Sequence, residues 1–166
     1  MSSTDQLEKW GGANVKHWAG VHASDEIPPG NRLPPIAKMV INYDPSDGVR
    51  IHGHTRDGSH WVGLSRHAIN GPGSASCQFF DSYANPPDGD MTVLNETKRR
   101  FRPWLRRWCP GGFEWNHVRL QAYGADQCGQ FSLYFAQNGL PPSQHWRWVS
   151  HDLRQNDSRI QSLVKL

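Results

Sequence analysis

The chain has 166 residues and a formal net charge of +3, with 36% hydrophobic and 20% charged residues. This length predicts one domain over residues 1–166. No apolar run approaches the roughly 20 residues of a membrane span, and no secretory h-region follows Met1. The 8 Trp, 6 Phe and 4 Tyr argue against disorder, while 16 Gly and 12 Pro predict a loop-rich domain. Three cysteines, an odd number, argue against a disulfide scaffold and favour a reducing compartment, with at least one thiol available for chemistry.

The first half of the chain is predicted to form one short helix and several strands. Ser3 or Thr4 is a candidate N-cap for a helix over residues 5–10, which Gly11-Gly12 end. Residues 11–35 are expected to be irregular, because prolines interrupt them. Apolar runs bounded by turn residues predict strands at 36–41, 49–55, 60–66 and 76–81.

The second half is predicted to be mainly helical. After Asp90, a candidate N-cap, apolar residues recur on one helical side at Met91, Leu94, Phe101, Leu105 and Trp108. Residues 113–120 are predicted to form a fifth strand. A helix over 128–138 ends at Gly139, and two short helices near 143–154 and 158–165 follow. Strands and helices are mixed without regular alternation, which favours an α+β fold with a central mixed sheet flanked by helices.

Cys128 is the strongest candidate for a reactive thiol. It lies in the first turn of its predicted helix, where the positive end of the helix dipole and unpaired backbone N–H groups favour thiolate. Gly129 removes a side chain beside the sulfur, which lets a substrate backbone approach. The alternative is a small apolar residue at a buried helix start.

A thiolate nucleophile needs a base, and His60 is the candidate because it opens an apolar strand directly after a turn. Asp81 ends the neighbouring predicted strand and would orient the imidazole if the two strands pair. Gln121 follows another predicted strand, and its amide can join the backbone N–H of Cys128 in holding an oxyanion. Each residue also has an ordinary structural alternative. The order His, Asp, Gln, Cys in four consistent contexts favours catalysis.

These motifs resemble those of the adenovirus-type cysteine proteases (adenains), within the wider class that includes the ubiquitin-like-protein proteases. The matching segments are SHWVGL at 59–64, FFDS at 79–82 and QAYGADQCG at 121–129, with WAGVHASDEIP upstream at 18–28. Six residues lie between Gln121 and Cys128, the adenovirus-type spacing, whereas the aspartate in Phe-Asp-Ser is similar to the cellular enzymes. The resemblance implies a papain-like core with His60 as base, Asp81 as its orienter, Gln121 as oxyanion donor and Cys128 as nucleophile.

The resemblance also implies two substrate-binding residues. Trp61 would roof a narrow substrate channel, with a core role as the alternative, and Gly124 would leave room for the substrate backbone. Such a channel admits residues without a side chain, and the class prefers Gly before the scissile bond. The expected function is a cysteine endopeptidase that cleaves viral precursor proteins after small residues during virion maturation, in the host cell (nucleus) and the virion.

Three other functions stay open from the sequence. One is an isopeptidase that removes ubiquitin or ubiquitin-like proteins, and another is an acyltransferase with the same order of site residues. The third, from a different class, is a non-catalytic basic module that binds nucleic acid. An exposed surface for a folded modifier would favour the isopeptidase. The four intact site residues argue against the non-catalytic module.

A cluster of cations precedes Cys109 in the sequence. On a helix they occupy the arc opposite the apolar residues, as a solvated face or a phosphate-binding surface would. They are Lys98, Arg99, Arg100, Arg102, Arg106 and Arg107. Adenovirus-type enzymes use DNA as an activating cofactor, so the resemblance implies DNA binding here. Those enzymes also join an upstream cysteine to an activating peptide, and Cys109 lies in a broadly similar place.

No metal and no cofactor for the chemistry are expected. His52, His54, His60 and Cys77 come close together in the sequence, but neither a C-x₂-C nor an H-x₃-H pair accompanies them. A structural zinc site needs four ligands. Cys77 alternates with apolar neighbours and is predicted to lie in the core, while Cys109 precedes Pro110-Gly111-Gly112 and is predicted to be exposed.

Overall fold

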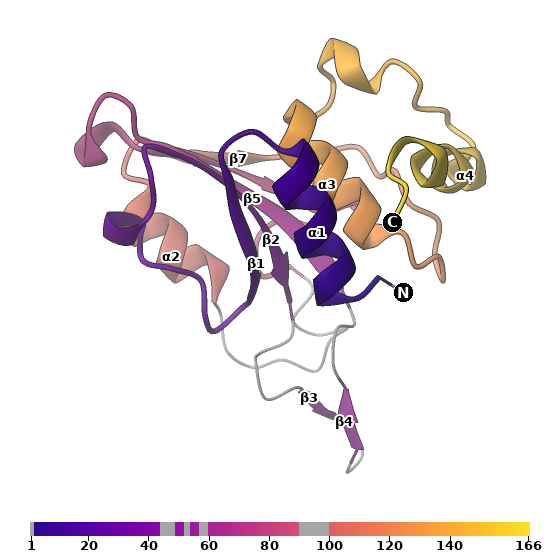
Figure 1. Cartoon of the computed structure of the whole chain (residues 1–166), viewed down its shortest axis with the longest axis horizontal. Coiled ribbons are helices and arrows are strands. Elements are labelled where there is room, and N and C mark those ends of the chain that lie inside the picture. Colours follow the sequence, from indigo (N-terminus) through magenta and orange to yellow (C-terminus); the bar gives the residue numbers. More distant parts are fainter. Residues whose placement is uncertain (1, 44–48, 52–53, 57–59, 90–99) are drawn as a thin grey trace.

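A computed structural model of the chain describes residues 2–43, 49–51, 54–56, 60–89 and 100–166 (Figure 1). Its centre is a five-stranded sheet in the order β1-β2-β5-β6-β7. The strands are β1 (Trp18–Ala23), β2 (Ile36–Asn42), β5 (Trp61–His67), β6 (Ser76–Phe80) and β7 (Phe113–Trp115). The three central strands are antiparallel, and the two edge strands run parallel to their neighbours. The predicted α+β fold with a mixed sheet is confirmed.

Helices cover both faces of this sheet. Helices α1 (Thr4–Asn14) and α3 (Cys128–Asn138) pack on one face, with α4 (Leu153–Leu163) beyond α3, and α2 (Phe101–Trp108) packs on the other (Figure 1). Successive strand residues point to opposite faces. In β2, Val40 therefore belongs to the core under α3, while Met39 and Ile41 belong to the core under α2.

Helix α3 crosses β5 at very short range. A Cβ added to Gly63 would lie 2.3 Å from a ring carbon of Phe135, so only glycine at this position admits the helix. Eight of the α3 residues are buried, from Cys128 to Ala136. The helix ends as predicted at Gly139, whose φ of 81° is readily adopted only by glycine. This close packing fixes the start of α3 against the first residues of β5.

The N-terminal segment differs from the prediction in helix α1, which is longer, and in strand β1, which is not predicted. Ser3 is the N-cap and forms a capping box with Gln6, as its sequence position suggests. The predicted end at Gly11-Gly12 is wrong, because the helix continues to Asn14. Gly11 is needed for packing, since a Cβ there would lie 2.3 Å from the Trp18 ring. Residues 18–23, predicted to be irregular, form the edge strand β1.

Four other predicted elements, two strands and the two C-terminal helices, differ from the structure. The strand at 49–55 is instead a two-stranded antiparallel ribbon of β3 (Val49–Ile51) and β4 (His54–Arg56). The strand at 113–120 stops at Trp115, and the C-terminal region has a short 3₁₀ turn at Gln144–Trp146 followed by the single helix α4. The part of the predicted helix before residue 100 lies outside the described residues. In the described part of the chain, no helix has the length and apolar character that a membrane span requires.

A disulfide joins Cys77 at the start of β6 to Cys109 at the end of α2. Both residues are buried, at 3% exposure each, and their Cα atoms lie 5.9 Å apart. The predicted core position of Cys77 is confirmed. The prediction of an exposed Cys109 that joins an activating peptide is wrong in this structure, because Cys109 is buried and bonded to Cys77. The cause is tertiary: α2 brings Cys109, the residue that follows it, back to the sheet beside β6.

Candidate active site

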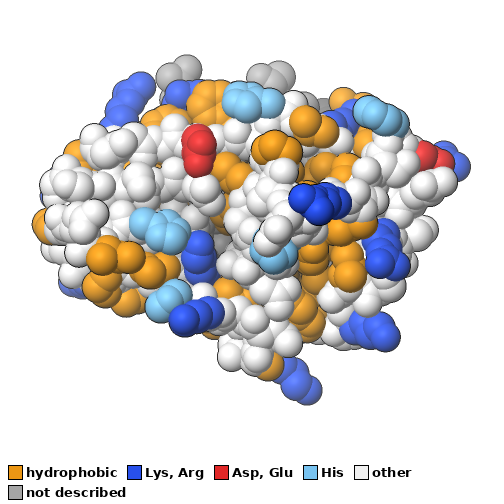
Figure 2. All heavy atoms as spheres, turned by 90° about the horizontal axis from the view of Figure 1, so that it is seen from above, with side chains coloured by type: hydrophobic (Ala, Val, Ile, Leu, Met, Phe, Trp, Pro, Cys, Tyr) orange, Lys and Arg blue, Asp and Glu red, His pale blue; other side chains and the backbone are white. Residues whose placement is uncertain are grey.

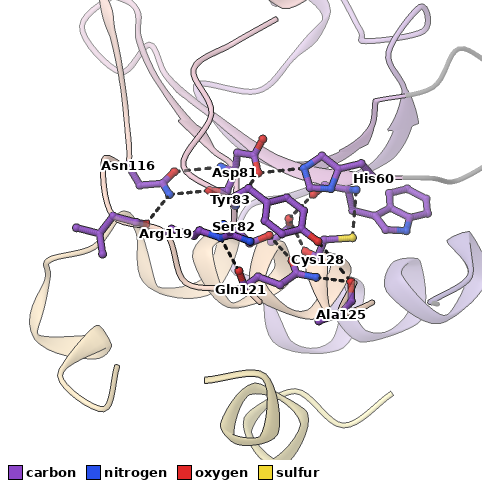
Figure 3. Close-up of polar contacts among 12 residues, drawn as sticks. His60, Asp81, Ser82, Tyr83, Asn116, Arg119, Gln121, Ala125 and Cys128 are labelled. Atoms are coloured by element: carbon purple, nitrogen blue, oxygen red, sulfur yellow. Dashed lines mark hydrogen bonds and ion pairs between the residues drawn. The ribbon is translucent and has the colours of Figure 1, made fainter. Parts of the chain in front are cut away.

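The predicted catalytic residues meet where β5 begins, β6 ends and α3 begins (Figure 3). His60 directly precedes β5, and Asp81 directly follows β6. These strands are antiparallel, with Gly63 opposite Phe80, so the start of β5 and the end of β6 lie at the same end of the sheet. The close approach of α3 to β5 brings Cys128 to this end of the sheet as well. The sheet thus assembles residues that are distant in the sequence.

Cys128 is the free cysteine of the described residues, and it is 4% exposed. Its Sγ accepts a hydrogen bond from the backbone N–H of Trp61 at 3.4 Å. Gln127, the N-cap residue of α3, makes no side-chain capping bond, so its side chain does not occupy the first N–H groups of the helix. Gly129 does not serve the substrate as predicted. It is buried, and a Cβ there would lie 3.0 Å from Leu7, so it admits α1 against α3.

His60 and Asp81 form a buried pair. The His60 Nε2 and Asp81 Oδ1 atoms are 3.0 Å apart, and the side chains are 5% and 0% exposed. The same Oδ1 also accepts the backbone N–H of Tyr83 at 2.8 Å. Because Nε2 faces the carboxylate, Nδ1 is the ring nitrogen left for the thiol. The predicted pairing of the two strands therefore brings His60 and Asp81 together.

The electrostatics of the site favour a protonated imidazole. Burial lowers the pKa of His60, but the charge and hydrogen bond of Asp81, together with the interaction with Cys128, outweigh it. The net effect raises the pKa of His60 well above its usual 6.5. An imidazolium beside a cysteine is the arrangement that activates a thiolate nucleophile. The three side chains can thus hold and transfer a proton at the sulfur.

Gln121 is held at both ends of its amide. Its Oε1 accepts from the Ser82 hydroxyl at 2.5 Å, and its Nε2 donates to the Ala125 carbonyl at 2.8 Å. A carbonyl only accepts, so the nitrogen end of the amide must face Ala125 and the segment that leads to Cys128. Gln121 is fully buried. Its fixed amide is a suitable oxyanion donor, because a preorganised donor needs no reorientation during reaction.

Two residues that follow Asp81 belong to the site: Ser82, the last residue of the FFDS motif, and Tyr83, which carries no signal of its own in the sequence. Ser82 holds Gln121 through its hydroxyl and through its carbonyl, which accepts the Gln121 N–H at 3.2 Å. Tyr83 stacks on the His60 ring at 5.3 Å between centroids, and its hydroxyl donates to Ala125 at 3.5 Å. Burial, and then the nearby Cys128, raise the pKa of Tyr83 to about 12, so it stays a neutral donor.

The two predicted substrate-binding residues have different surroundings. The side chain of Trp61 is 2% exposed and belongs to the core between β5 and α3, which is the core role considered for it. Its backbone N–H faces the thiol. Gly124 has a φ of 79°, and a Cβ there would meet no atom within 4 Å. Glycine is therefore favoured at 124 by backbone conformation rather than by crowding.

The predicted basic surface is only partly described. Lys98 and Arg99 lie outside the described residues, while Arg106 and Arg107 are exposed on α2. Arg102 donates to the Pro87 carbonyl at 3.1 Å. Figure 2 shows the molecule from above, a face on which Lys and Arg side chains lie scattered among uncharged ones. Arg100 begins the described part after the gap, as the residue before α2.

No group of three or more possible metal ligands occurs among the residues that the structure describes. His52, one of the histidines considered for zinc, is outside them. His54 is described only as part of β4. His60 is engaged by Asp81, and Cys77 by its disulfide.

Comparisons with known proteins identify a fold. No protein-family model and no curated protein matches the chain. Among solved structures, the ASFV pS273R protease matches 97% of this chain with a TM-score of 0.51 and 14% identity. Its selenomethionine crystal structure matches 80% (TM-score 0.42, 20% identity), and AvrA with IP6 and CoA matches 80% (TM-score 0.45, 18% identity).

This chain spans 64% of the length of the first of these structures, and 45% and 44% of the other two. At 14% identity, the first match shows a shared fold. The chain shares the α+β fold of the ASFV pS273R protease, with a central mixed sheet flanked by helices. The adenovirus-type assignment stays a prediction from the sequence motifs.

Proposed function

We propose that this chain is a cysteine endopeptidase with Cys128 as nucleophile, His60 as acid and base, Asp81 as orienting carboxylate and Gln121 as oxyanion donor. One observation carries the proposal. A buried imidazole with a raised pKa lies between a carboxylate and a thiol at the start of a helix. The shared fold with the ASFV pS273R protease supports the same reaction class.

In this reaction the Cys128 thiolate attacks the carbonyl carbon of the scissile peptide bond and forms a C–S bond. The carbonyl oxygen becomes an oxyanion, held by the backbone N–H of Cys128 and the Gln121 amide. His60 gives its proton to the leaving amine as the C–N bond breaks. A water molecule then gives a proton to His60 and attacks the thioester, which breaks the C–S bond and restores the thiolate and the imidazolium.

The proposed substrates are protein chains with a small residue, Gly above all, before the scissile bond. The burial of the reacting groups supports this specificity, because His60 and Cys128 are each only 4% exposed. Tyr83 covers the imidazole and reaches Ala125, which leaves little room for a substrate side chain. Viral precursor proteins, cleaved during virion maturation in the nucleus or the virion, are the proposed natural substrates, following the adenovirus-type motifs.

A peptide library tests the proposal directly. Peptides with Gly at the two positions before a bond are incubated with the chain, and the products are identified by mass spectrometry. We expect cleavage after Gly by the wild type and none by Cys128→Ala. Release of a fluorophore from ubiquitin without any cleavage of the library would assign the site to a modifier isopeptidase instead. Cleavage that persists in Cys128→Ala would contradict the mechanism.

A further inference from the structure

Asn116 makes paired hydrogen bonds to the backbone of Asp81 (Figure 3). Its Oδ1 accepts the Asp81 N–H at 3.0 Å, and its Nδ2 donates to the Asp81 carbonyl at 2.7 Å. The side chain is buried, with 2% of the residue exposed, and its Nδ2 also reaches the Val118 carbonyl at 3.4 Å. One side chain thus satisfies both backbone groups of Asp81.

These bonds occur where β6 and β7 separate. The parallel ladder between the two strands has its last partners at Phe79 and Trp115. Beyond them Asp81 enters a turn that is closed by the Ala84 N–H. A carboxamide carries one acceptor and a donor, as a peptide unit does. The Asn116 side chain therefore replaces the next step of the ladder, and Asp81 keeps a defined backbone position at the end of the sheet.

We propose that Asn116 is a positioning residue for the Asp81–His60 pair. It fixes the backbone of Asp81 and so directs the carboxylate at the imidazole. The inference deepens the proposed function and rests on it for the link to catalysis. Asp81 Oδ1 lies 3.0 Å from His60 Nε2 and also accepts the Tyr83 N–H, so a shift of the Asp81 backbone would change both contacts.

A merely structural asparagine would be expected to stabilise the fold without acting on the imidazole, and the chain contains a matched example. Asn156 is 1% exposed and makes the same paired bonds to the Ser150 backbone, at 2.8 and 2.9 Å, with a further bond to the Leu120 carbonyl at 3.2 Å. Its substitution removes equivalent bonds away from His60. It is therefore the control for lost stability.

The test compares Asn116→Ala, Asn116→Gln and Asn156→Ala in the full chain. The first readout is the NMR titration of the His60 ring, which needs no substrate. The titratable groups that face this ring are Asp81, Cys128, Tyr43 and Tyr83, and every variant keeps them. We expect the His60 titration midpoint to move to lower pH in both Asn116 variants and to stay unchanged in Asn156→Ala.

The second readout is peptide hydrolysis. A misplaced catalytic group costs up to about 100-fold in rate, so we expect kcat to fall about 10- to 100-fold in Asn116→Ala with KM unchanged. Asn116→Gln keeps the amide but displaces it, and carries the test if the alanine variant does not fold. A His60 titration identical to wild type in a folded Asn116 variant would overturn the inference. If the wild type cleaves no peptide, the proposed function fails while the titration still decides the role of Asn116.

Discussion

The fixed amide of Gln121 yields a quantitative prediction. In Gln121→Ala the oxyanion loses one of its two proposed donors, which typically lowers kcat by about 10² to 10³, or about 2.7–4 kcal/mol of transition-state stabilisation. The substitution also removes the bonds to Ser82 and Ala125, each worth about 1 kcal/mol of the free energy of unfolding, and leaves the Ser82 hydroxyl without this partner. We therefore expect a folded but less stable protein with a large loss in turnover.

Ser82→Ala separates positioning from donation. It removes the bond to Oε1 at 2.5 Å and leaves the bond from Nε2 to Ala125 at 2.8 Å. The donor stays in the site but is held at one end only. We expect kcat to fall by less than in Gln121→Ala, because the amide is loosened and not deleted.

The assay pairs kcat for a Gly-containing peptide with the rate at which iodoacetamide alkylates Cys128. Neither variant touches the thiol or His60, so we expect the alkylation rates to match wild type. Gln130→Ala is the matched control. Gln130 lies on the same helix as Cys128, and its Nε2 donates to the Val164 carbonyl at 2.9 Å, so the variant also loses an amide hydrogen bond. It should lose stability and keep kcat. A parallel loss of alkylation and turnover in Gln121→Ala would refute the oxyanion assignment.

Three further results are expected. Asp81→Asn removes the charge that raises the pKa of His60, so that pKa should fall and the alkaline limb of the kcat/KM profile should move to lower pH. The raised pKa stabilises the fold at pH values below 6.5, and this contribution is lost as pH rises through the folded pKa, so the stability difference from wild type should shrink with rising pH. Coincident profiles of variant and wild type would contradict this assignment. Reduction of the Cys77–Cys109 disulfide, which closes a loop with a sequence separation of 32, should lower the free energy of unfolding by about 2–4 kcal/mol in urea titrations, and an equal midpoint with and without reductant would argue against it. If Arg106 and Arg107 bind DNA phosphates, log K for DNA binding should fall less steeply with log salt in the double Gln variant, by about 2 in slope, and basal hydrolysis should be kept. Equal slopes would leave these arginines as a solvated face.

The sequence by itself determines the elements whose signals are local. Ser3 caps α1 because its hydroxyl reaches an N–H three residues along, and Gly139 ends α3 because it adopts a positive φ. The same local logic locates Cys128 at a helix start and His60 and Asp81 at strand ends. At each of these positions the local conformation depends on residues within about one helical turn along the chain, so a sequence pattern can predict it.

Only the tertiary structure decides which residues meet across the sheet. Gly11 reads as a helix breaker, yet it lies inside α1 because the Trp18 ring needs its space. Cys77 and Cys109 read as separate thiols until α2 brings them together. Asn116 falls inside the predicted strand at 113–120, and its bonds to Asp81 form only because β6 and β7 pair and then separate beside it. In each case the partner is distant along the chain, and the contact forms only once the strands are in register and the helices are packed on them.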